Sequence, residues 1–415
     1  MSDATAQSTA ATAGTSATMK ASRPGNALIQ KAISVVSRLD TGRLTLILPD
    51  GHAYELSSNT THGPHAVVKV VRWRALRRFV TEGDFGFVAS YMDGDWESPE
   101  LSNIIELATL NAKSWDAGAM QSFFSRLWTR VAHVLRANTK SGAKRNIAAH
   151  YDLGNDFYSQ WLDPTMTYSS AYFENENQPL SDAQLLKYRR IADMLQLKPG
   201  QRVLEVGFGW GGFAEVAVKE YGCHLTGLTL SKEQLKFAAE RMQRLGLSDK
   251  VDFRLEDYRD TAGTFDRIAS IEMFEAVGEA NWPRYFQMIR DRLVGGGSAA
   301  LQIITIAEDR FEQYRRSADF IQSYIFPGGM LPSVTILKDQ IAQAKLQFAG
   351  ADMFGLSYAK TLRTWRDRFL GAWSSIEPLG FDDRFRRMWE MYLAYCEGGF
   401  RAKSIDVGQF KLVRP

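Results

Sequence analysis

The sequence predicts an α/β protein: a Rossmann-like, doubly wound parallel sheet preceded by a smaller α+β N-terminal domain. Strand and helix patterns alternate from about residue 185 to residue 306, as in doubly wound folds. A glycine-rich turn at 207–212 follows the first of these strands. The 415 residues exceed one average domain, and 45% hydrophobic with 23% charged residues is ordinary globular usage. This composition excludes a disordered, collagenous or coiled-coil protein.

The sheet domain is expected to extend over residues 150–415. Hydrophobic patterns predict strands at 202–206, 224–229, 251–254, 265–271 and 299–306, and helices at 211–221, 232–245 and 282–293. Residues 307–345 form a long insertion, and 347–415 add terminal strands and helices.

The N-terminal part is expected to contain a tail and a small domain. Residues 1–26 are rich in Ser, Thr and Ala without an apolar run, which predicts a disordered tail and not a signal peptide. Alternating residues around Pro49-Asp50-Gly51 predict a β-hairpin. Residues 66–112 look helical, with a turn at Glu82-Gly83-Asp84, so the first domain is expected at 27–112.

Residues 113–149 are expected to form a basic amphipathic linker. No acidic residue lies between Asp116 and Asp152, and this stretch contains six lysines and arginines: Arg126, Arg130, Arg136, Lys140, Lys144 and Arg145. Its apolar residues fall on one helical face. Such a helix could lie on an anionic membrane together with the first domain, or pack on the core with a solvated basic side.

Other features limit the class of protein. The sequence has no uninterrupted run of 18 apolar residues, so a membrane-spanning helix is not expected. Cys223 and Cys396 are the two cysteines, too few for a disulfide framework or a Cys-rich zinc site, and no metal site is expected. A net charge of +3 gives no argument for nucleic acid.

The glycine-rich turn predicts a nucleotide-type cofactor. Gly207, Gly209 and Gly212 match GxGxxG, which alone is a weak signal. A dinucleotide enzyme wants an acid about 20 residues later for the ribose, and none ends the next strand. Glu205 is awkward beside a pyrophosphate but suits a cation, so the turn favours S-adenosylmethionine over NAD. A tight turn without a ligand is the plain alternative.

Ordered motifs over the C-terminal part resemble the cyclopropane-fatty-acyl-phospholipid synthase family, which includes the mycolic acid cyclopropane synthases. Besides the glycine turn, the matching blocks are 150–158, 162–173, 228–234, 257–260, 273–278, 324–333, 368–373 and 395–402. The first domain resembles that of the bacterial phospholipid enzymes more loosely. The resemblance implies a class I methyltransferase fold and methyl transfer from S-adenosylmethionine to a cis double bond of phospholipid acyl chains.

The resemblance also implies the cofactor site. Tyr168 and Ser169 would lie near the methionine end, and Gly207, Gly209 and Gly211 in the turn. Thr229, Leu230 and Gln234 would lie at the ribose and adenine, and Asp257 and Tyr258 at the adenine. Ser231 with Gln234 also fits a helix capping box, and both interpretations can hold together.

Methylation of an alkene leaves a cation on the chain, so the reaction needs a dry site and a base. Loss of a proton from the new methyl closes a cyclopropane ring, and loss from a chain carbon gives a methyl-branched or methylene product. In the family the base is thought to be a bicarbonate held by a Cys, Glu, His, Tyr and a backbone Ile. The matching residues here are Ser170, Glu275, Gln302, Tyr358 and Ile304, so Ser and Gln replace Cys and His.

Several of these residues have plainer interpretations. Glu275 could be a helix-start carboxylate, and Tyr358 could be a half-buried aromatic residue. The family flags the position of Cys396 as an active-site cysteine, but Cys396 could also be a small core residue. No histidine follows His224, which excludes a histidine base in the acceptor half.

The favoured function is therefore cyclopropane formation on phospholipids. The first alternative is a fatty-acyl methyltransferase with a methyl-branched or methylene product, and the second is a methyltransferase that acts on a small molecule. A lipid-binding protein without chemistry is disfavoured by Glu205 and the glycine turn. The family further implies a homodimer, cytoplasmic and peripheral on the inner face of the membrane. A methyl-branched product would require a separate redox partner.

Overall fold

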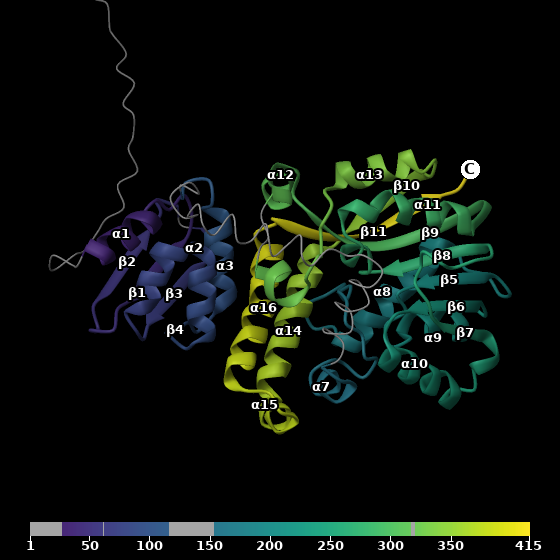
Figure 1. Cartoon of the computed structure of the whole chain (residues 1–415), viewed down its shortest axis with the longest axis horizontal. Helices are drawn as coiled ribbons and strands as arrows, with labels where there is room; N and C mark the ends of the chain where they lie inside the picture. Colours follow the sequence, from purple (N-terminus) through teal and green to yellow (C-terminus); the bar gives the residue numbers. More distant parts are fainter. Residues whose placement is uncertain (1–26, 61, 116–152, 317–319) are drawn as a thin grey trace, which may run out of the picture. The chain divides into compact units, whose positions relative to one another are not determined.

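The computed structural model describes residues 27–60, 62–115, 153–316 and 320–415 (Figure 1). The expected tail 1–26 and nearly all of the basic linker 113–149 lie outside the described residues. The chain divides into two compact units, Met1–Gln121 and Ser122–Pro415.

The first unit is a small α+β domain. Its four-stranded sheet has the order β2-β1-β3-β4, and its described elements are α1 (Ala27–Val36), β1 (Arg43–Ile47), β2 (Ala53–Ser57), β3 (His65–Val70), α2 (Arg74–Met92), β4 (Trp96–Glu97) and α3 (Leu101–Leu110). β1 and β2 are antiparallel and joined at Gly51, where φ is +86°, so the predicted hairpin is confirmed.

The helical prediction for residues 66–112 is wrong at its start and at β4, which pairs with β3. Residues 65–70 form β3, whose alternate side chains are buried and which pairs in parallel with β1. Val67, Val68 and Val70 are β-branched and favour a strand, and the backbone pairing with β1 decides the outcome. The predicted turn at 82–84 is a kink at Gly83 within α2, where φ is +63°.

The second unit contains a seven-stranded sheet with the order β10-β11-β9-β8-β5-β6-β7. Its strands are β5 (Arg202–Val206), β6 (His224–Thr229), β7 (Val251–Leu255), β8 (Phe265–Ile271), β9 (Leu293–Ile306), β10 (Gln347–Met353) and β11 (Ile405–Val413). β11 runs antiparallel to both neighbours, so the predicted parallel sheet is mixed at this edge. The other strand pairs are parallel.

The predicted helices at 211–221, 232–245 and 282–293 are confirmed as α9 (Gly212–Lys219), α10 (Lys232–Arg244) and α11 (Trp282–Arg292), with small shifts at their ends. The other described α-helices of this unit are α7 (Asn155–Ser159), α8 (Leu180–Leu195), α12 (Glu308–Arg316), α13 (Val334–Gln343), α14 (Gly355–Gly371), α15 (Trp373–Ile376) and α16 (Asp383–Arg401). β9 begins at Leu293, six residues before the predicted start at 299. The prediction missed these residues because Gly295–Gly297 give no strand pattern, although Gly296 and Gly297 form backbone hydrogen bonds with Arg414.

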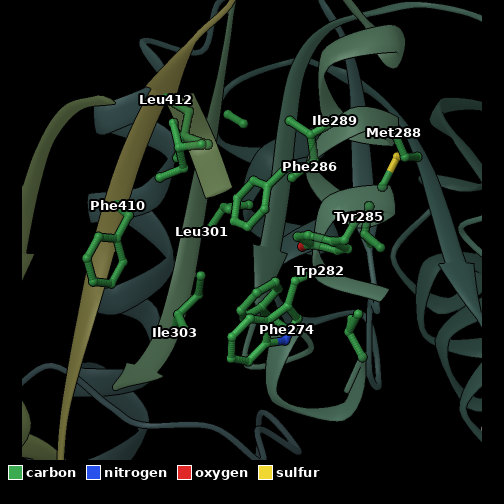
Figure 2. Packing of buried hydrophobic residues seen from close by; sticks show 14 of the residues in the cluster. Phe274, Trp282, Tyr285, Phe286, Met288, Ile289, Leu301, Ile303, Phe410 and Leu412 are labelled. Atoms are coloured by element: carbon green, nitrogen blue, oxygen red, sulfur yellow. The ribbon is translucent and has the colours of Figure 1, made fainter. Parts of the chain in front are cut away.

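Two hydrophobic clusters cover the two faces of this sheet. One contains α11 and α13 against β9 and β11, and the other contains α8 and α9. Figure 2 shows the first cluster, in which Phe286 of α11 lies near Leu301 of β9. Successive side chains of a strand point to opposite faces of the sheet. Accordingly, Leu301 of β9 packs in the first cluster and its neighbour Ala300 packs in the second.

The first cluster makes the core of this unit sensitive to truncation. Phe286 is fully buried, so Phe286→Ala should lower the free energy of unfolding by about 3–5 kcal/mol. Leu245 is 38% exposed at the end of α10, and the matched variant Leu245→Ala should change it by less than about 0.5 kcal/mol. Urea unfolding followed by tryptophan fluorescence checks both, and equal midpoints would contradict this placement of the core.

Candidate active site

The glycine-rich turn joins β5 to α9 through a backbone path that requires glycine. Gly207, Gly209 and Gly211 have φ of +82°, +55° and +83°. A Cβ added at Gly207 would lie 2.8 Å from the Met273 side chain, whereas one at Gly209 would meet no atom within 4 Å. The turn is therefore tight on the side of Met273 and open at Gly209, as a cofactor-binding turn should be.

Glu205 lies at the carboxyl end of β5 directly before this turn. It is 2% exposed, and its Oε2 has no hydrogen-bond partner among the described residues. Burial raises the pKa of Glu205 well above its ordinary value, against the positive charges of Lys187 and Arg241. A buried carboxylate oxygen without a donor fits the ammonium group of S-adenosylmethionine.

The end of β6 presents a second set of polar groups. The Ser231 hydroxyl accepts from the Gln234 backbone N–H at 3.2 Å, which confirms the predicted helix cap at the start of α10. The Thr229 hydroxyl donates to Gln234 Oε1 at 2.8 Å. This contact orients the Gln234 amide, and Leu230 lies between the two residues in the chain. These groups fit a ribose.

Asp257 and Tyr258 follow β7 and differ in their contacts. Arg259 donates two hydrogen bonds to the Asp257 carboxylate, at 2.8 and 2.6 Å. Tyr258 packs edge-on against Tyr285, and burial raises the pKa of its hydroxyl to about 12. Asp257 is thus paired within the chain, with Arg259 of the same matching block, 257–260.

Tyr168 contacts Tyr392, and Ser169 contacts a lysine that sequence reasoning missed. The Tyr168 and Tyr392 hydroxyls are 2.8 Å apart, and Lys187 Nζ donates to the Ser169 hydroxyl at 2.6 Å. Burial lowers the pKa of Lys187 to about 7, while the nearby carboxylates of Glu272, Asp163 and Glu205 oppose this shift. Lys187 was not predicted because α8 gives an ordinary amphipathic pattern.

The centre of the site is Glu272, which sequence reasoning also missed. It directly follows β8, with the unusual φ of +50°. Its Oε1 accepts from the Ser170 backbone N–H and from Gln302 Nε2, both at 2.8 Å, and its Oε2 accepts from the Tyr358 hydroxyl at 2.6 Å. Burial raises the pKa of Glu272, and these donors together with Lys187 oppose the rise.

The orientation of Gln302 is set by its neighbours. Gln409 of β11 donates to Gln302 Oε1 at 3.1 Å, and Gln302 Nε2 also lies 3.3 Å from the Ser170 carbonyl oxygen. A flipped amide would bring its oxygen against those of Glu272 and Ser170. Gln302 therefore presents its donor to Glu272.

Glu275 occupies a separate position in the turn η2 (Phe274–Ala276). Its Oε1 accepts from the Ile304 backbone N–H at 2.6 Å, and its buried Oε2 has no hydrogen-bond partner among the described residues. Burial, with the negative charge of Glu272 as a second cause, raises the pKa of Glu275 to about 8.

The predicted cradle residues thus meet, but around two glutamates. Ser170, Gln302 and Tyr358 contact Glu272, whereas Ile304 contacts Glu275. The Ser170 hydroxyl, predicted to bind an anion, instead donates to the Ala171 carbonyl at 2.9 Å.

Cys396 lies on α16 and is half-buried. Burial raises the pKa of the Tyr358 and Tyr392 hydroxyls, and Cys396 adds to both shifts electrostatically. Cys396 is therefore near the site, next to its tyrosines.

A signal for Glu272 was present in the sequence. A carboxylate at the carboxyl end of a parallel strand next to the glycine turn lies where doubly wound sheets bind ligands. Glu205 satisfies the same rule one strand away and was found by it.

Comparisons with known proteins agree with this geometry. A family model described as mycolic acid cyclopropane synthetase matches residues 138–410. The tuberculostearic acid methyltransferase of Mycobacterium tuberculosis is 40% identical over 351 residues, which cover 81% of each chain. The cyclopropane-fatty-acyl-phospholipid synthase of Escherichia coli is 39% identical over 340 residues, 80% of this chain and 84% of that one.

A solved structure supports the same assignment. A mycolic acid cyclopropane synthase complexed with SAH and CTAB has a TM-score of 0.61 and 32% identity, covering 65% of this chain and 98% of that one. The chain belongs to the mycolic acid cyclopropane synthetase family and is an S-adenosylmethionine-dependent methyltransferase with the class I α/β fold.

Proposed function

We propose that the protein methylates the cis double bond of unsaturated acyl chains in membrane phospholipids and that the product is a cyclopropane fatty acid. The main supporting observation is the buried cluster of Glu272, Glu275, Gln302 and Tyr358 beside the glycine turn. A carbocation intermediate needs a base and the exclusion of water. Gln302 is fully buried and Tyr358 is 7% exposed, so the cluster offers both.

In this proposal S-adenosylmethionine supplies an activated methyl group. Glu205 binds the ammonium of its methionine part, next to Tyr168 and Ser169. Gly207, Gly209 and Gly211 let the backbone approach it, while Thr229, Leu230 and Gln234 bind the ribose, and Asp257 and Tyr258 lie at the adenine. The orphaned Glu205 oxygen and the open side of Gly209 support this assignment.

The phospholipid substrate is supported by the similarity to the Escherichia coli phospholipid synthase, which extends over 80% of this chain. No described helix is long and apolar enough to cross a membrane. As the family resemblance implies, we propose a cytoplasmic homodimer that is peripheral on the inner face of the membrane, with the basic segment 113–149 as the contact to anionic lipid.

A methyl-branched product is the second candidate. It is favoured by the 40% identity to a tuberculostearic acid methyltransferase and by Ser170 and Gln302, where the family's cradle has Cys and His. A separate redox partner would then complete the product. The two candidates share the methyl-transfer step and differ in which proton leaves.

The product can be identified directly. Expression in a host without this activity should yield fatty acids heavier by one CH2, and proton NMR should show upfield ring-methylene signals. Retained olefinic signals with a new methyl group would support the methyl-branched candidate instead. GC–MS of the same extract gives the yield, but mass alone does not distinguish the two products, because both have gained one CH2.

Glu205 can be tested by cofactor binding. Losing a charge-assisted hydrogen bond costs about 1.5–3 kcal/mol, so Glu205→Gln should weaken S-adenosylmethionine binding about 10- to 100-fold. The cation needs the ionised carboxylate whereas burial favours the neutral form, so wild-type affinity should rise as pH rises through the raised pKa of Glu205.

Calorimetry over a pH series measures the affinity of both forms for S-adenosylmethionine. The affinity of the Glu205→Gln variant should lack the rise with pH that depends on Glu205. Glu220→Gln is the matched control, because Glu220 pairs with Arg189 at the surface end of α9. An unchanged affinity in Glu205→Gln would remove Glu205 from the cofactor site.

Substrate class is tested on membranes. The full chain should sediment with vesicles containing dioleoyl phosphatidylglycerol, and salt should release it if the basic segment supplies the attraction. A protein that stays in the supernatant at low salt would favour a soluble small molecule as the methyl acceptor.

A further inference from the structure

We infer that the carboxylate of Glu272 is the general base of the methyl-transfer reaction, built into the chain in place of a bound bicarbonate. The inference rests on the proposed function, since this base is needed only when an unsaturated carbon chain is methylated. It concerns how the proton is removed, and it holds for either product.

The first argument is that Glu272 already uses the donors expected to hold bicarbonate. The Tyr358 hydroxyl and the Gln302 amide both donate to it, and Ser170 donates through its backbone N–H. The two remaining groups are also engaged: the Ile304 N–H donates to Glu275 and the Ser170 hydroxyl to Ala171. An additional anion would find these five donors occupied.

The second argument is electrostatic. A bicarbonate at this place would lie beside the carboxyl groups of Glu272 and Glu275, whose pKa values are both raised by burial. Like charges in a low-dielectric site repel strongly. The cluster therefore has room for one anionic charge, and Glu272 supplies it.

The third argument is that the three hydrogen bonds suit an ionised carboxylate with one acceptor position left. Two carboxylate oxygens offer about four lone-pair sites. Oε1 accepts two hydrogen bonds and Oε2 accepts one. A further site on Oε2 can thus take a proton. Glu275 accepts from the Ile304 backbone N–H and from its own, and burial raises its pKa to about 8.

The position of Glu272 fits this role. β5 and β8 are parallel neighbours, so Glu205 and Glu272 lie at the same edge of the sheet. The next residue, Met273, lies against Gly207 of the cofactor turn. Ser170, which donates to Glu272, follows Ser169 and Tyr168, the residues proposed for the methionine end of the cofactor.

The step balances as follows. The π electrons of the alkene form a bond to the methyl carbon while the carbon–sulfur bond breaks with its electron pair on sulfur, leaving a cation on the neighbouring chain carbon. Glu272 then accepts one proton. If it comes from the new methyl, the C–H electrons close the ring; if from a chain carbon, they form a new double bond. The proton finally leaves to solvent.

The test compares labelled methyl transfer to dioleoyl phosphatidylglycerol vesicles by several forms of the full chain. Wild type should be equally fast in carbon-dioxide-free buffer and with added bicarbonate. Glu272→Gln should lose about 10²- to 10⁴-fold in rate, the usual contribution of a general base, with S-adenosylmethionine affinity within about twofold by calorimetry. Glu220→Gln should match wild type.

A second variant separates a lost base from a damaged fold. Glycine adopts the positive φ of residue 272 without strain. Glu272→Gly should therefore keep the backbone conformation and leave the three donors of Glu272 without their acceptor. Added bicarbonate or formate should restore its rate, and it should retain [13C]bicarbonate in NMR titrations where wild type does not.

The outcomes are distinguishable. The inference is overturned if Glu272→Gln forms labelled lipid as fast as the wild type. It is also overturned if the rate of the wild-type enzyme falls when bicarbonate is removed. Absence of labelled lipid with wild type overturns the proposed function instead. Stoichiometric [13C]bicarbonate on wild type overturns the inference whether or not lipid is methylated.

Discussion

The burial of one carboxylate at the edge of the sheet is the constraint on which the site depends. Removing a carboxylate from water costs several kcal/mol unless donors compensate. Glu272 obtains its donors from the segment before α8, from β9 and from α14. Because each donor belongs to a different element, satisfying this charge fixes where those elements meet. The same contacts exclude water, which the chemistry requires.

The sequence predicted the central sheet well because its local signals agree with its tertiary role. The predicted bounds of β5, β6 and β8 match the structure, since short apolar runs there are bounded by turns and buried on both faces. The start of β9 and the whole of β3 and β4 were missed. Gly295–Gly297 have no side chains to form a pattern, and β3 owes its conformation to pairing with β1.

The cofactor turn was predictable from sequence because its residues are contiguous and each has a local reason, either positive φ or close approach. The carboxylate cluster was not, because it forms between residues far apart in the chain. Glu272 is separated from Ser170 by 102 residues, from Tyr358 by 86 and from Gln302 by 30. The resemblance brought these partners to attention but not the residue on which they converge.

The positive φ of Glu272 has an evolutionary consequence. This backbone suits glycine, and a glutamate held there stores strain on the order of 1–3 kcal/mol. Glycine and glutamate codons can differ by a single base, so one mutation could exchange a base carried by the protein for one drawn from dissolved carbonate. An enzyme with the glutamate would work at a rate independent of the carbon dioxide pressure around the cell.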